Sequence, residues 1–150
     1  MGNLWEYTVV FLLAAVPWFE IAAVIPLGIV RGLQPAVVVI LAFIGNMSTI
    51  ILVVYLFEKI REYFIRKGKI KEDGKRQQRA KKIWNKYGLP GLALLGPVLI
   101  GTHIAAFIGM TFGATKNWTL LWMTISLVLW SAVFGVGSYF GIETLKTMIK

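Results

Sequence analysis

Three long runs without a formal charge limit what this chain can fold into. They are the 26 residues between Arg31 and Glu58, the 29 between Lys86 and Lys116, and the 26 between Lys116 and Glu143. A helix of about 20 residues crosses the roughly 30 Å hydrocarbon layer of a bilayer, so each run is long enough for one span. We therefore expect an all-α integral membrane protein, whose backbone polar groups bond within helices.

A fourth apolar stretch, from Val9 to Val30, is interrupted by Pro17, Glu20 and Pro26. It lacks the basic start and the small-residue cleavage site of a secretory signal, so we expect it to remain part of the fold. The hydrophobic content is 57% and the mean hydropathy is +0.71. We expect a single integral membrane domain over residues 1–150.

Most of the net charge of +9 comes from residues 58–86, where 12 of the 16 Lys and Arg residues alternate with four acids. The positive-inside rule predicts that this linker is cytoplasmic in a multi-pass protein of a cell membrane. Gly68 and Gly74 interrupt it. Lys75 to Tyr87 is compatible with a basic helix on anionic lipid headgroups and with a solvated loop that carries an aromatic membrane anchor. The predicted lipid-facing residues are Lys75, Arg76, Arg79, Lys81, Lys82 and Trp84.

The two apolar halves carry a weak repeat. The spacing of Gly28 and Gly32 recurs 81 residues later as Gly109 and Gly113. This predicts two inverted repeats, about 4–57 and 87–141, each a Pro- and Gly-broken, re-entrant helical hairpin followed by a transmembrane helix. The four glycines are expected at close helix contacts within the hairpins. Alternatively all four apolar segments cross completely, which would put both termini in the cytoplasm instead of outside.

Glu20 is the strongest candidate for a functional residue. An ionisable group inside an apolar segment costs several kcal/mol unless it is paired, hydrated or protonated, so Glu20 is predicted to hold a proton or a cation. His103, the one histidine, lies in the third segment, and imidazoles exchange protons near neutral pH, so a relay with Glu20 is possible if the two are close. A structural ion pair or a carboxylate reaching the membrane surface is the alternative for Glu20.

Other polar or helix-breaking residues complete the predicted substrate and proton path. Prolines leave backbone carbonyls without an N–H partner, although a helix kink alone would explain them. A guanidinium near the membrane surface suits phosphate but also serves as an ordinary interfacial anchor. A buried amide or hydroxyl needs a partner on another element. These residues are Pro26, Arg31, Asn46, Pro97 and Thr102.

Several kinds of chemistry lack support in the sequence. There is no Cys, so no disulfide or thiolate site is possible, and a single His gives no metal-binding spacing. The GxSxG, HExxH and P-loop patterns do not occur either. We expect no enzyme activity, no metal and no cofactor.

In its first half the chain resembles the small multi-drug export proteins, which are related to the wider DedA, or VTT-domain, superfamily. The second half is similar to the second characteristic region of that family. The motifs that carry the resemblance are Pro17-Trp18-Phe19-Glu20, Ile25-Pro26-Leu27-Gly28, Gly32-Leu33-Gln34-Pro35, Gly45-Asn46, Tyr87-Gly88-Leu89-Pro90-Gly91, Pro97 and Gly101-Thr102.

This resemblance implies two inverted re-entrant hairpins that meet near the membrane midplane, with Glu20 as the acidic residue of the first tip. DedA-like proteins have two arginines around the second tip, where this chain has Pro97 and His103. An arginine-dependent phosphate clamp at that tip is therefore not expected here.

Three functions remain open on the sequence. The first is a small transporter of an amphipathic substrate, with proton coupling through Glu20. The second is a lipid scramblase or lipid-carrier flippase, in which the basic linker gathers anionic lipids. The third is a membrane scaffold that transports nothing. The expected partners are membrane lipids, an amphipathic substrate and a second copy of the chain, since four apolar segments provide little material to enclose a path; no nucleic acid is expected.

Overall fold

The computed structural model describes residues 4–68 and 75–148, and its regular structure there is entirely helical. The helices belong to two compact units. Unit 1 comprises Met1–Ser48 and Leu127–Lys150, and unit 2 comprises Thr49–Ser126. Two long helices, α3 (Pro35–Tyr55) and α7 (Lys116–Met148), each contribute one part to each unit.

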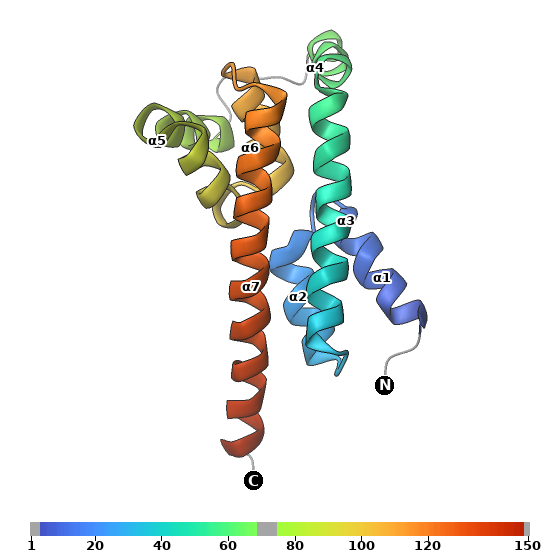
Figure 1. Ribbon diagram of the computed structural model, residues 1–150. Coiled ribbons are helices and arrows are strands. Elements are labelled where there is room, and N and C mark those ends of the chain that lie inside the picture. The colour runs from blue at the N-terminus through green and yellow to red at the C-terminus, as the bar shows by residue number, and fades with distance from the viewer. Residues whose placement is uncertain (1–3, 69–74, 149–150) are drawn as a thin grey trace. The chain divides into compact units, whose positions relative to one another are not determined.

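Unit 1 begins with a hairpin of two short helices, α1 (Leu4–Ala15) and α2 (Glu20–Val30), which pack on each other (Figure 1). Their 12 and 11 residues correspond to lengths of about 18 and 16 Å at 1.5 Å per residue. Helix α1 ends just before Pro17, because the residue before a proline is disfavoured in helical conformation. The first apolar segment is thus two half-length helices.

Helix α2 ends in a Schellman cap centred on Gly32. The Gly32 N–H donates to the Ile29 carbonyl at 2.9 Å, and the Leu33 N–H donates to the Gly28 carbonyl at 3.1 Å. This cap requires a left-handed residue after the helix, and Gly32 has a φ of 82°. Pro35 then begins α3, where its missing N–H leaves no intrahelical bond unmade.

Unit 2 contains α4 (Phe57–Arg66), α5 (Lys75–Leu99) and α6 (Thr102–Thr111), together with parts of α3 and α7. The third apolar segment is broken, as predicted. Gly88 has a φ of 63° and divides α5 into a basic part, residues 75–87, and an apolar part, residues 89–99. The apolar part packs against α6, which follows a turn at Gly101.

The 81-residue repeat is present in the backbone as well as in the sequence. Gly113 and Ala114 donate to Met110 and Gly109, at 3.1 and 3.0 Å. These are the two capping bonds of α2 displaced by 81 residues, and Gly113, with a φ of 102°, takes the left-handed position. Helix α7 begins at Lys116, which is 81 residues after Pro35.

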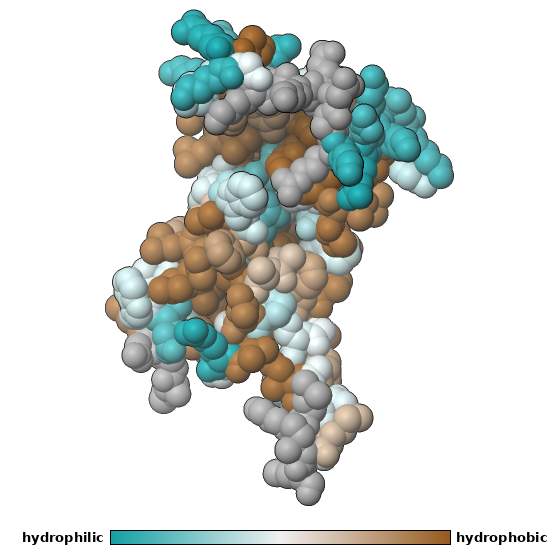
Figure 2. Space-filling view, turned by 180° about the vertical axis from the view of Figure 1, so that it is seen from behind, coloured by the Kyte–Doolittle hydropathy of each residue, from teal (hydrophilic) through white to brown (hydrophobic). Residues whose placement is uncertain are grey.

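Two helices in the described part are long and apolar enough to cross a membrane, Pro35–Tyr55 and Lys116–Thr144. Their outward-facing side chains are largely apolar, including Ile40, Leu52 and Val128, each 56% exposed. In Figure 2 hydrophilic side chains gather over α4 and the first part of α5. The charged side chains of the linker therefore lie at the surface of unit 2.

The linker itself is more regular than a loop. Helix α4 occupies residues 57–66, and Gly68, with a φ of 61°, lies beyond its end as predicted. Of the two alternatives for Lys75 to Tyr87, the basic helix is present as the first part of α5. The second predicted break, Gly74, lies outside the described residues.

Candidate functional site

Glu20 lies at the tip of the first hairpin, as the first residue of α2. It is 5% exposed, and Ile21, Val24 and Ile25 beside it on α2 are at most 2% exposed. Its backbone is left-handed, with a φ of 44°, a conformation that costs a non-glycine residue about 1–3 kcal/mol. A buried acidic residue is therefore held at a strained turn between two apolar helices.

The tip of the second hairpin has a comparable turn, with glycine at the left-handed position. Gly101, which is 81 residues after Glu20, has a φ of 99° and precedes α6. Sequence comparison of the halves did not single out this pair. Glu20 and Gly101 thus occupy equivalent left-handed positions. Such a position favours glycine, but the first half has glutamate there.

His103 lies in the first turn of α6 and is 4% exposed. Its Nε2 is 2.6 Å from the Thr49 hydroxyl of α3, and its Nδ1 is 3.2 Å from the Thr102 hydroxyl. Each ring nitrogen therefore has a hydroxyl within hydrogen-bond distance. Two buried side chains, Thr102 and His103, and the partly buried Thr49 thus form a polar network within unit 2.

Some of the predicted path residues contact one another in the structure, and others belong to a different unit. Thr102 and His103 are partners, and the Thr49 hydroxyl of α3 also contacts His103. Asn46, also on α3, is fully buried in unit 1. Glu20 belongs to unit 1 and His103 to unit 2, so a relay between them remains a prediction.

Pro97 has a local structural role that the sequence did not reveal. A proline at position 97 has no N–H for the carbonyl of Ala93, four residues earlier. The Ser126 hydroxyl of α7 donates to that carbonyl at 2.7 Å, in a buried position. The carbonyl freed by Pro97 is thus used within unit 2 and is not left to face a cavity or an ion.

Pro26 lies inside α2, which continues to Val30. Its exposed fraction is intermediate, and Ile25 before it is fully buried. The structure therefore places this proline within the first hairpin, on a helix that it does not terminate.

The four repeated glycines divide into two kinds. A Cβ at Gly28 would lie 2.8 Å from Val38 Cγ1 of α3, and one at Gly109 would lie 2.8 Å from Leu89 Cδ1 of α5, so both glycines are at close contacts. A Cβ at Gly32 or Gly113 would meet no atom within 4 Å among the described residues. Gly32 and Gly113 instead provide the left-handed caps of α2 and α6.

Arg31 lies at the end of α2 and is exposed. It lines a pocket between α1 and α2 together with Glu6. It lies at the end of the hairpin away from the Glu20 tip, and its location near a membrane surface remains a prediction.

The predicted lipid-facing residues lie on the basic part of α5. Lys75, Arg79, Lys81 and Lys82 are exposed, whereas Ala80 is fully buried. The helix therefore has one basic face and one face turned inward. Arg76 lies on the same helix, but its side chain is outside the described part of the structure.

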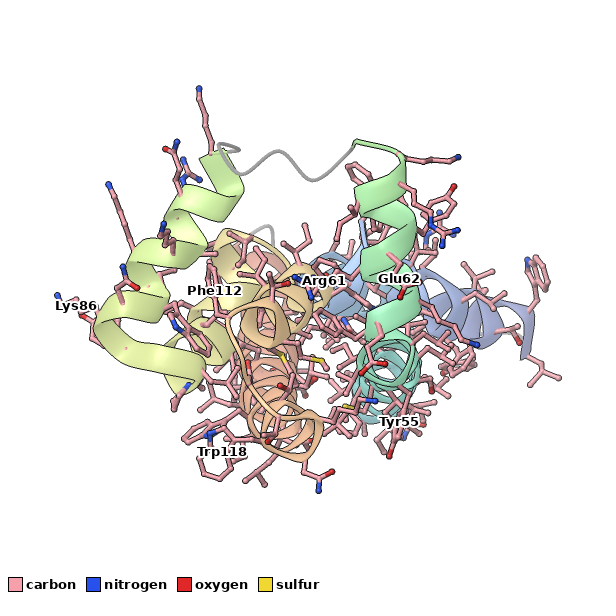
Figure 3. The ribbon with its side chains drawn as sticks, turned by 90° about the horizontal axis from the view of Figure 1, so that it is seen from above. Tyr55, Arg61, Glu62, Lys86, Phe112 and Trp118 are labelled. Atoms are coloured by element: carbon pink, nitrogen blue, oxygen red, sulfur yellow. The ribbon has the colours of Figure 1, made fainter. Side chains whose placement is uncertain are left out.

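Trp84 is half-buried, and its ring packs against Phe112 with centroids 5.3 Å apart. It anchors α5 to the end of α6 as well as being available at the surface. Lys86 points away from the packed side of α5 (Figure 3), and its Nζ lies 5.0 Å from the centre of the Tyr87 ring.

Comparison with known proteins gives one family match. A family model described as "Putative small multi-drug export protein" matches residues 20–133, well over half of the 150 residues. No curated protein and no solved structure matches the chain. The matched region begins at Glu20, the residue that follows the first tip turn, and includes the second tip turn, the basic helix and the His103 network.

Proposed function

The chain belongs to the small multi-drug export protein family, and from that premise we propose that it is a small membrane transporter of an amphipathic substrate. The observation that carries this proposal is Glu20, a carboxyl group that is 5% exposed at a strained break between two apolar half-helices. A group kept at such a cost inside an apolar segment indicates function more than stability.

Glu20 acts as the proton or cation site of this transporter. A carboxyl group buried within an apolar membrane segment can bind either a proton or a cation. Exchange of a proton for a cationic, amphipathic substrate at one carboxylate couples their movements. His103 and Thr102 with Asn46 line the remainder of the proposed path.

The proposed topology is a multi-pass protein of a cell membrane with two inverted repeats. Helices of about 18 and 16 Å are too short for a hydrocarbon layer of about 30 Å, which supports a re-entrant first hairpin. The apolar part of α5 and the 10-residue α6 support the same arrangement for the second. Residues 58–86 are then cytoplasmic, since their positive charge opposes translocation.

We further propose that the protein is a homodimer. We also propose that it has no enzyme activity. The tip of the first hairpin exposes two aromatic side chains, Trp18 at 83% and Phe19 at 46%. Such a surface suits contact with lipid or with a second copy. The mass of the protein in lipid nanodiscs tests this point, because a strictly monomeric mass contradicts the dimer.

The deciding experiment compares wild-type protein with Glu20→Gln after reconstitution in liposomes. A fluorescent amphipathic cation, internal pH and a fluorescent phospholipid are followed in the same preparation. A matched control is Glu58→Gln, which makes the same chemical change at an exposed position outside the hairpins.

We expect cation movement driven by a proton gradient in wild type and in Glu58→Gln. Glu20→Gln is expected to abolish it while the protein remains folded by circular dichroism. Proton-driven movement that persists in Glu20→Gln contradicts the role of Glu20.

A lipid scramblase is a second candidate, favoured by the exposed basic face of α5. Lys75, Arg79, Lys81 and Lys82 are all exposed on this helix, and each basic residue near an anionic membrane surface contributes about 1 kcal/mol of attraction. Phospholipid movement that depends on neither the proton gradient nor Glu20 would favour this function over a coupled transporter.

A further inference from the structure

The pocket between α1 and α2 is amphipathic. Its volume is about 220 Å³. One charged residue from each helix, Glu6 near the start of α1 and Arg31 after the end of α2, lies at the open end of the hairpin, where Trp5 also lines the pocket. The remaining walls are apolar and continue toward the tip through Val9, Val10, Leu13, Val24, Leu27, Gly28 and Leu33.

The open end of the hairpin is held in place by its own contacts. The Gln34 N–H donates to the Tyr7 hydroxyl at 3.2 Å, which fixes the turn after α2 against α1. Gly28 allows α2 to approach Val38 and Val10 closely. These contacts therefore hold in place the two helix ends that carry Glu6 and Arg31.

The charges in the pocket are of opposite sign and accept complementary groups. The Arg31 side chain has no hydrogen-bond or ion-pair partner among the described residues, so its five N–H donors are available to a phosphate. The Glu6 carboxylate has about four lone-pair positions. It can therefore accept a hydrogen bond from an ammonium group in addition to its interaction with another residue.

The size of the pocket narrows the class of ligand. Sites that enclose a drug-sized molecule have volumes of roughly 300–1,000 Å³, so a pocket of about 220 Å³ holds only part of a larger molecule. A phospholipid fits this description, because one acyl segment enters the apolar part while the remainder of the lipid stays in the bilayer.

We propose that this pocket is a binding site for a phospholipid with a phosphoethanolamine headgroup. Arg31 binds the phosphate, Glu6 binds the primary ammonium group, and the apolar walls hold an acyl segment that points toward the hairpin tip. This inference goes beyond the proposed transport function, because binding here does not require Glu20 to exchange a proton.

The test uses the full chain in detergent and measures retained lipid by native mass spectrometry. Phosphatidylethanolamine and phosphatidylglycerol with identical acyl chains compete for the protein. Wild type is expected to retain the ethanolamine lipid preferentially. Arg31→Gln should reduce retention of both lipids about tenfold or more, since a charge-assisted hydrogen bond is lost.

The most informative variant is Glu6→Lys. It is expected to reverse the lipid preference, so that phosphatidylglycerol is retained more than phosphatidylethanolamine. A reversed preference cannot arise from misfolding, because misfolding would reduce the retention of both lipids alike. Val9→Trp fills the apolar part and should reduce retention of both lipids. Leu12→Trp is its control on an exposed position of α1 that does not line the pocket.

Equal retention of the two lipids by wild type, or an unchanged preference in Glu6→Lys, would overturn the proposal. Lipid retention that is unchanged in Arg31→Gln and in Val9→Trp would also overturn the proposal, since the lipid would then be bound elsewhere. Glu20→Gln should keep the wild-type preference. A failure of proton-coupled transport is therefore distinguishable from a failure of this lipid site.

Discussion

At the scale of single residues, Ser126 and Pro97 form a compensating pair. The serine hydroxyl donates to the Ala93 carbonyl, which has no helical partner because residue 97 is proline. We expect Ser126→Ala to lower the free energy of unfolding by about 1–3 kcal/mol, since a buried carbonyl then lacks a donor. In Pro97→Ala the backbone N–H can donate to Ala93, so Ser126→Ala should be much milder in that background.

Denaturation of the four variants of this cycle in nanodiscs measures the coupling between the two positions. Ser48→Ala is a suitable control, because the Ser48 hydroxyl donates at 2.7 Å to Ile44 of its own helix. Equal effects of Ser126→Ala with and without Pro97 would show that the two residues act independently.

Glu20 allows strain and charge to be separated at one position. Glycine adopts a φ of 44° without the cost paid by glutamate, and glutamine retains that cost while removing the charge. We expect Glu20→Gly to have a free energy of unfolding about 1–2 kcal/mol higher than Glu20→Gln. Neither variant should show proton-driven transport. A Glu20→Gly protein that is less stable than Glu20→Gln would contradict a strained turn.

The sequence predicted Glu20 and His103 as buried polar residues because charge or imidazole in an apolar segment is conspicuous. It did not predict the partners of His103 or Pro97, since a single Thr or Ser inside an apolar helix is common. The hydroxyls of Thr49 and Ser126 become informative only when the helices are packed. Residues that are separated by tens of positions cannot be paired from spacing alone.

At the scale of elements, the two halves share helix caps and hairpin breaks. The repeated glycines were predicted from their spacing, but that spacing has two physical explanations. Gly28 and Gly109 lie at close contacts, whereas Gly32 and Gly113 provide left-handed caps. Sequence cannot distinguish a helix that continues through two such glycines from one that ends at the second.

A close approach of α1 to α3 gives a test at this scale. A Cβ at Gly45 would collide with the backbone carbonyl oxygen of Phe11, and a backbone atom moves only if the helix moves. We expect Gly45→Ala to lower the thermal stability of the protein markedly. Gly137→Ala has open space around it and should be neutral or up to about 1 kcal/mol more stable, by helix propensity.

Thermal denaturation of both variants in the same detergent makes this comparison. Similar stabilities for the two would contradict tight packing of α1 on α3. Loss of transport together with loss of stability in Gly45→Ala would link the position of the first hairpin to function.

At the scale of the whole molecule, membrane topology distinguishes re-entrant hairpins from complete spans. If segments one and three both turn back, α3 and α7 are the two crossings, and the start of α1 and the end of α7 lie outside. If all four segments cross, both ends lie in the cytoplasm with the basic linker. The half-length helices of the first hairpin favour the former arrangement.

The chain contains no cysteine, so single cysteines report topology without background. We expect a membrane-impermeant thiol reagent added outside intact cells to label Thr8→Cys and Thr147→Cys, and to label Lys81→Cys only after permeabilisation. All three positions are exposed on described helices. Labelling of Thr8→Cys and Thr147→Cys only after permeabilisation would contradict re-entrant hairpins, because an even number of complete crossings would then separate each end from the cytoplasmic linker.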